Sequence, residues 1–124
     1  MNRVLIIDDD EDMRSMLLQL MERVGIEAIG ARDGNDGLQQ FDAFQPNLVI
    51  TDIVMPGKEG LETIIEMRRK YPDVSIIAIS GGGRVGPDSY LPIAKQFGAR
   101  YVFAKPLNRN EFLFAVRQCL STKA

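Results

Sequence analysis

Two apolar segments of the chain each end in carboxylates. Residues 4–7 run into Asp8 and Asp9. Residues 48–51 run into Asp52 in the same way. If the two segments are neighbouring parallel strands, these carboxylates meet at one edge of a sheet. Carboxylates that converge repel one another and are costly to bring together unless a cation neutralises them. The pattern therefore predicts a cation site at this edge.

Two further apolar segments end in residues that suit phosphate chemistry. One is followed by Ser80 and Gly81, and the last one in the chain is followed by Lys105. A lysine ammonium, a serine hydroxyl and a glycine N–H can all approach a phosphoryl oxygen. With Mg²⁺ held by the hard oxygens of the aspartates, these groups can stabilise a transferring phosphoryl group. In that chemistry Asp52 is the nucleophile and forms an aspartyl phosphate.

The composition excludes several classes of function. The chain has 124 residues, of which 45% are hydrophobic, which is enough for the core of one domain. A net charge of −2 argues against direct binding of nucleic acid. The absence of histidine excludes histidine-based catalysis and metal ligation. We find one cysteine, no signal peptide and no apolar run near the ~20 residues of a membrane span. We therefore expect a cytoplasmic protein without membrane contact.

Apolar, β-branched segments alternate with segments of helical periodicity along the whole chain. Strands that are continuously apolar are covered on both faces, so the pattern predicts an α/β fold with a doubly wound parallel sheet. We expect one domain over residues 1–124, with no output domain. Asp10 and Asn108 are suited to cap the first and last helices. The expected strands are 4–7, 28–31, 48–53, 75–79 and 100–104, and the expected helical segments are 13–24, 38–44, 61–68, 90–97 and 112–120.

The motifs together resemble the receiver domains of two-component response regulators. The resemblance covers the whole sequence. It implies a flavodoxin-like sheet of five parallel strands in the order 2-1-3-4-5, with five helices. The matching residues, in chain order, are 4–10, 52–56, Gly60, Ser80 with Gly81, Gly98 with Ala99, and Lys105 with Pro106.

This resemblance implies a role for each acidic residue. Asp52 would be the phosphoacceptor and also a metal ligand. Asp9 would bind Mg²⁺ directly, and Asp8 would bind it largely through water. The backbone carbonyl of Val54 would complete the ligands that the protein supplies.

Further roles follow for the residues at the ends of the last two strands. Ser80 would be the switch hydroxyl, and Lys105 would contact the phosphoryl group. The peptide bond between Lys105 and Pro106 would be cis. The chain departs from the family at Val102, where receivers usually carry an aromatic switch residue, and strand alternation directs the flanking aromatic residues to the opposite face. It also departs in a longer glycine-rich loop after Ser80.

As a receiver, the chain would take its phosphoryl group from a sensor histidine kinase or a phosphotransfer protein. It would not be an enzyme in its own right, although it would assist its own phosphorylation and dephosphorylation. A separate output protein would read the face built by helix 4, strand 5 and helix 5. The partners would include neither nucleic acid nor a membrane.

Two alternatives remain open. A small Mg²⁺-dependent aspartyl phosphatase of the haloacid dehalogenase type would use Asp8 and Asp10 after the first strand. The chain is short for such an enzyme's cap, and no acidic pair follows Lys105. A phosphate-independent interaction module would have lost this chemistry. The intact site residues argue against that reading, whereas Val102 favours an altered switch.

Overall fold

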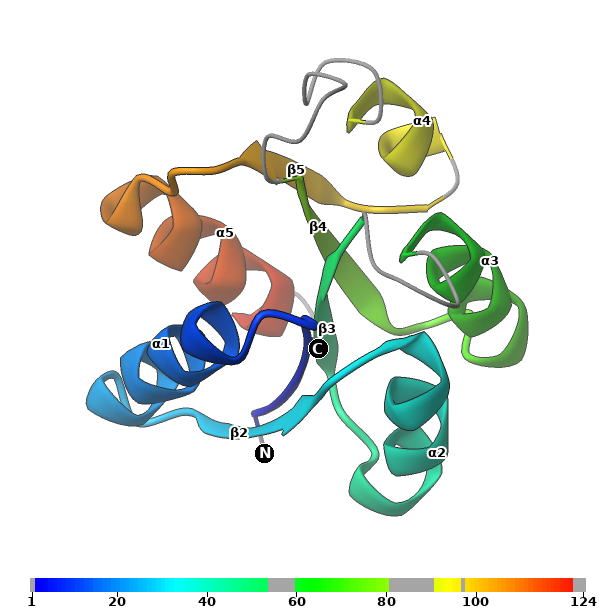
Figure 1. Cartoon of the computed structure of the whole chain (residues 1–124), viewed down its shortest axis with the longest axis horizontal. Coiled ribbons are helices and arrows are strands. Elements are labelled where there is room, and N and C mark those ends of the chain that lie inside the picture. Colours follow the sequence, from blue (N-terminus) through cyan, green and yellow to red (C-terminus); the bar gives the residue numbers. More distant parts are fainter. Residues whose placement is uncertain (1, 54–59, 81–90, 97, 122–124) are drawn as a thin grey trace.

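The sheet has five parallel strands in the order β2-β1-β3-β4-β5, as the sequence predicts (Figure 1). The computed structural model describes residues 2–53, 60–80, 91–96 and 98–121. The strands are β1 (Arg3–Ile7), β2 (Glu27–Ala31), β3 (Leu48–Asp52), β4 (Ser75–Ser80) and β5 (Tyr101–Ala104). The helices are α1 (Glu11–Arg23), α2 (Gly34–Phe44), α3 (Gly60–Lys70), α4 (Leu91–Gln96) and α5 (Arg109–Ser121).

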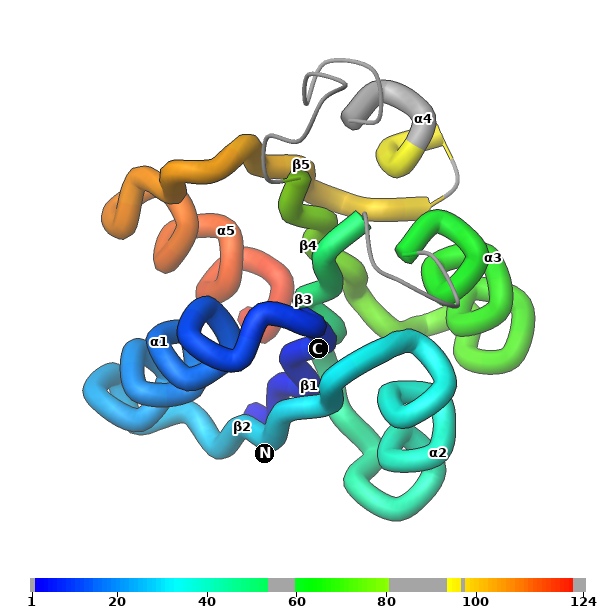
Figure 2. The backbone as a smooth tube through the Cα atoms, in the orientation of Figure 1, coloured from blue at the N-terminus to red at the C-terminus, as the bar shows by residue number. Residues whose placement is uncertain are grey.

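Helices cover both faces of the sheet, which explains why its central strands are apolar without interruption. α1 and α5 lie on one face, and α2 and α3 lie on the other (Figures 1 and 2). Successive side chains of β1 alternate between two cores. Val4 and Ile6 pack in the core under α1 and α5, whereas Leu5 and Ile7 pack in the core under α2 and α3. Within the described ranges, no helix is long and apolar enough to cross a membrane.

Side-chain caps start the helices that follow the strand ends. Asp10 accepts hydrogen bonds from the N–H groups of Asp12 (3.0 Å) and Met13 (3.4 Å) at the start of α1. Asn108 accepts one from Glu111 (3.0 Å) at the start of α5. These bonds satisfy helix N–H groups that have no partner within the helix. Both predicted caps are therefore confirmed.

The start of α2 differs from the prediction. The helix begins at Gly34, where Asp33 accepts a hydrogen bond from the N–H of Asp36 (2.8 Å). Its first turn holds polar residues and glycines, so the apolar periodicity becomes visible only at Leu38. Gly37 in this turn lies against Ile7, and any side chain there would collide with the Ile7 methyl group. The cap and this close contact, rather than an apolar stripe, define the start.

Two apolar residues within the predicted helical segments lie nearer the surface than the residues beside them. Met16 of α1 is 49% exposed, while Leu17 and Met21 of the same helix are buried. On α3, Ile65 is only half-buried and Met67 is fully buried. One step along a helix turns a side chain by about 100°, so Met16 points away from the core that buries Leu17.

Candidate metal and phosphate site

The register of the sheet brings the predicted acidic residues to one edge. Ile7 of β1 pairs with Thr51 of β3. The residues that follow them, Asp8 and Asp52, therefore lie side by side at the carboxyl edge of the sheet. One carboxylate oxygen each from Asp8, Asp9 and Asp52 lies within 4.8 Å of the others. Asp8 and Asp52 are buried, whereas Asp9 is exposed to solvent. A cation at this edge would therefore have two buried ligands and one open side.

Lys105 faces the two buried carboxylates from the far side of the same edge. Its Nζ lies 3.6 Å from Oδ2 of Asp8 and 3.6 Å from Oδ2 of Asp52. The backbone N–H of Lys105 donates a hydrogen bond to the carbonyl of Ser80, the last residue of β4 (2.9 Å). The peptide bond between Lys105 and Pro106 is cis. Lys105 directly follows β5, and the buried Ser80 ends β4. Both residues therefore lie at the ends of adjacent strands, beside the acidic group.

Asp8 is held so that one of its carboxylate oxygens stays available. Oδ1 accepts a hydrogen bond from the N–H of Asp10 (2.9 Å). Oδ2 is buried and accepts no hydrogen bond among the described residues. Burial raises the pKa of the Asp8 carboxyl, and the charges of Asp9 and Asp10 raise it further. The bond from Asp10 N–H and the Lys105 ammonium oppose that rise in pKa.

The donor set fits a hard divalent cation. Mg²⁺ prefers oxygen ligands and is usually bound by one or two carboxylates together with water and phosphate oxygens. A buried carboxylate oxygen without a hydrogen bond, such as Oδ2 of Asp8, is costly unless a cation or a donor satisfies it. The resemblance to receiver domains also implies two phosphate or metal contacts from Val54 and Gly81. Both residues, and the glycine-rich loop from Gly81 to Asp88, lie outside the described residues.

Gly60 packs closely against the end of β3, a contact that its place in the sequence motif did not reveal. Its N–H donates a hydrogen bond to the carbonyl of Ile53 (2.8 Å). A Cβ on Gly60 would collide with the carbonyl oxygen of Asp52 and would lie 2.5 Å from Cα of Ile53. The first turn of α3 therefore packs directly on the backbone that carries Asp52. Only a residue without a side chain permits this approach.

The residues around Val102 follow the predicted alternation. Val102 is half-buried in the core on the α2 and α3 side, which also contains Ala94 of α4. Tyr101 and Phe103 pack on the opposite face. There the ring of Phe103 meets Phe112 of α5 edge-on, at a centroid distance of 5.6 Å. No aromatic side chain of β5 therefore lies on the α4 side of the sheet.

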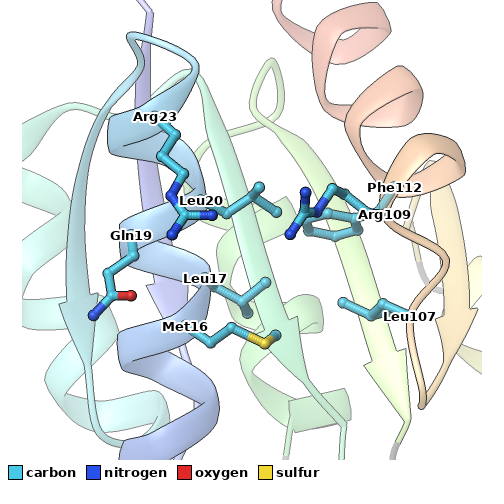
Figure 3. A pocket seen from close by; sticks show the side chains of 8 residues that line it. All are labelled: Met16, Leu17, Gln19, Leu20, Arg23, Leu107, Arg109 and Phe112. Atoms are coloured by element: carbon cyan, nitrogen blue, oxygen red, sulfur yellow. The ribbon is translucent and has the colours of Figure 1, made fainter.

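A separate groove runs between α1 and α5, away from the acidic edge (Figure 3). It has a volume of about 300 Å³. Figure 3 shows Leu17, Leu20 and Phe112 inside it and the guanidinium groups of Arg23 and Arg109 on its two sides. The exposed Met16 also lines it. None of the predicted site residues lines this groove, so the acidic edge and the groove are distinct features.

Comparison with known proteins identifies the family of the chain. The family model described as "Response regulator receiver domain" matches residues 4–117. This chain belongs to the response regulator receiver domain family. It is 31% identical over 121 residues to the nitrogen assimilation regulatory protein NtrX of Azorhizobium caulinodans, covering 96% of this chain and 26% of that protein. It is 30% identical to the chemotaxis protein CheY of Thermotoga maritima, covering 94% of this chain and 95% of that protein.

A solved structure supports the same assignment. The structure of this chain resembles that of the response regulator protein TrrA from Thermotoga maritima in complex with Mg²⁺-BeF, with a TM-score of 0.85 and 30% identity. The match covers 97% of this chain and 100% of that one. The receiver spans only part of several curated relatives, 26% of NtrX and 50% of the transcriptional regulatory protein CpxR of Escherichia coli.

Sequence reasoning missed one contact at this site. Arg14 of α1 donates a hydrogen bond from Nη1 to the backbone carbonyl of Asp8 (2.8 Å). The signal available in the sequence was weak, because a single arginine on an amphipathic helix is normally solvated. Only the fold shows that it points back at the acidic edge.

Proposed function

We propose that the chain accepts a phosphoryl group on Asp52 from a histidine kinase or a phosphotransfer protein. Asp8, Asp9 and Asp52 would hold the Mg²⁺ that this transfer needs. The observation that carries the proposal is the meeting of these carboxylates within 4.8 Å of one another, with Lys105 facing two of them at 3.6 Å. Family membership supports it, as does the TrrA relative, whose structure contains Mg²⁺-BeF.

The proposed transfer uses groups that are already in place. An ionised carboxylate oxygen of Asp52 attacks the phosphorus, a new O–P bond forms, and the donor leaves with the electrons of its own bond to phosphorus. Bound Mg²⁺ would supply positive charge to the phosphoryl oxygens and relieve the repulsion among the carboxylates. The Lys105 ammonium shifts from the carboxylates to a phosphoryl oxygen. The Ser80 hydroxyl, one strand end away, donates a hydrogen bond to another.

We propose that the resulting change is read at the face of α4, β5 and α5 by a separate output protein. A backbone hydrogen bond joins Lys105 to Ser80. A movement of both side chains toward the phosphoryl group would therefore be transmitted to β5. Phe114 of α5 is 60% exposed and borders a hollow that Tyr101 and Phe103 also line. An exposed aromatic residue beside an apolar hollow suits a protein partner.

Acetyl phosphate labelling tests the proposed phosphoacceptor. With Mg²⁺ present, we expect one phosphoryl group on the unaltered chain and none on Asp52→Asn, because the amide is not a nucleophile. The matched control is Asp12→Asn, which makes the same chemical change at an exposed position of α1 and should label normally. Peptide mapping by mass spectrometry identifies the modified residue. Labelling of Asp8 would instead favour the phosphatase alternative.

Binding of beryllofluoride separates a working receiver from a phosphate-independent module. We expect Mg²⁺ and beryllofluoride together to shift the NMR signals of residues at the ends of β1, β3 and β5. Neither reagent alone should give the same shifts. Unchanged spectra, in a protein that is folded, would favour the module that has lost its chemistry.

A further inference from the structure

We propose that Arg14 is a positioning residue of the metal site, which it serves by holding the backbone of Asp8, and that Gly30 is glycine because Arg14 must lie across it. The inference rests on the proposed function of the acidic edge. It extends that function to the side of α1 that faces β2. The residues there are not among the proposed metal ligands.

The first observation is how completely the Asp8 main chain is held. Its N–H donates a hydrogen bond to the carbonyl of Ala31 at the end of β2 (3.1 Å). Its carbonyl accepts the charge-assisted bond from Arg14 Nη1 (2.8 Å). With Oδ1 bound to the N–H of Asp10, the remaining oxygen, Oδ2, is the one that faces Lys105. Arg14 is the only part of this arrangement that comes from the body of a helix.

The second observation explains Gly30. Its φ angle is not in the left-handed region, so the backbone does not require glycine there. A Cβ at this position would lie 3.0 Å from Cδ and 3.1 Å from Cγ of Arg14, and 3.2 Å from Cδ1 of Leu18. These separations are shorter than ordinary van der Waals contact. The aliphatic stem of Arg14 therefore lies against Gly30, and its guanidinium reaches the carbonyl of Asp8.

Arg14 acts through geometry rather than as a counter-charge. Its hydrogen bond is made to the backbone carbonyl of Asp8 and not to the carboxylate. Groups that orient a metal ligand without touching the metal typically change metal affinity by about 10–100-fold when removed.

The test compares Mg²⁺ affinity among variants that are shown to be folded in EDTA. Arg14→Met keeps the stem and removes the donor, and we expect it to raise the Mg²⁺ Kd by about 10-fold, measured by NMR titration. Arg14→Lys, which retains a donor, should bind Mg²⁺ more tightly than Arg14→Met. The matched control Arg23→Met, in the last turn of the same helix, should leave the Kd unchanged.

Gly30→Val gives an independent route to the same answer. It keeps Arg14 but fills its path, so we expect a similar loss of Mg²⁺ affinity. Adding Gly30→Val to Arg14→Met should then cost little more, because both changes break one interaction. In metal-free protein, amide exchange at Asp8 should quicken by about 10-fold in either variant, which reports the loosened backbone without any metal.

The outcomes distinguish this inference from the proposed function. If the unaltered chain binds Mg²⁺ and labels on Asp52 while Arg14→Met binds Mg²⁺ equally tightly, the positioning role is wrong and the receiver chemistry stands. Fully additive losses from Arg14→Met and Gly30→Val would also overturn the role assigned to Gly30. If the unaltered chain does not bind Mg²⁺, the proposed function itself fails.

Discussion

The carboxyl edge of the sheet and the core beneath α1 and α5 use the same strands in opposite ways. In that core, side chains such as Phe112 and Ile6 are fully buried among other apolar groups. At the edge, Asp8 and Asp52 are also buried, but as neighbouring carboxylates that share one lysine. Burial of apolar groups stabilises the fold, whereas burial of like charges opposes it. The core therefore supplies stability, whereas the edge costs stability unless its charges are neutralised.

The largest expected loss of stability comes from a substitution in the core beneath α1 and α5. Phe112→Ala should lower the free energy of unfolding by about 3–5 kcal/mol, because it leaves a cavity beside Phe103 and removes a fully buried ring. Phe114→Ala is the matched control on the same helix. Phe114 is 60% exposed, so its loss should cost no more than about 0.5 kcal/mol. Urea unfolding measures both, and equal losses would contradict the assigned core.

A change at Gly60 should affect the edge and stability together. Gly60→Ala places a methyl group against the carbonyl of Asp52, so we expect a loss of about 1–3 kcal/mol, typical of overpacking. The displaced strand end should also slow acetyl phosphate labelling of Asp52 in protein that remains folded. Thermal unfolding and labelling rates measure the two effects. Normal labelling at reduced stability would separate Gly60 from the site.

The smallest expected change in stability comes from removing one charge at the carboxyl edge. Asp8→Asn keeps an acceptor for the N–H of Asp10 but removes one buried charge. In metal-free protein at neutral pH we expect it to raise the free energy of unfolding by on the order of 1 kcal/mol. With Mg²⁺ present the gain should shrink or reverse, because the unaltered carboxylate then has a cation. A loss of stability in EDTA would show that Asp8 is a structural residue.

The same variant should change the dependence of stability on pH. Because the pKa of Asp8 is raised in the folded state, the folded chain binds the proton more tightly than the unfolded chain does. The stability that this proton contributes is complete below the ordinary value of 3.8 and is lost as pH rises through the folded pKa. Asp8→Asn should lack this loss. Urea unfolding in EDTA across that window measures it.

The parts of the fold that were predictable are those with a repeating pattern. All five strands begin and end within one residue of the predicted bounds, because their apolar runs are continuous and covered on both faces. The start of α2 was not predictable in this way, because Asp33 and Gly37 define it through a cap and a close contact. The exposure of Met16 was not predictable either, because the sequence pattern is the same whether an apolar residue is buried or lines a groove.

From the sequence alone one could predict that Asp8, Asp9, Asp52 and Lys105 meet at one edge, because parallel strands place their last residues side by side. The sequence also determined that Val102 leaves the α4 side of β5 without an aromatic side chain. Only the tertiary structure decided that Lys105 lies equally far from two carboxylates, and that Arg14 reaches Asp8 across Gly30. A pattern along one chain assigns a residue to an element, whereas distances between elements depend on how their side chains pack.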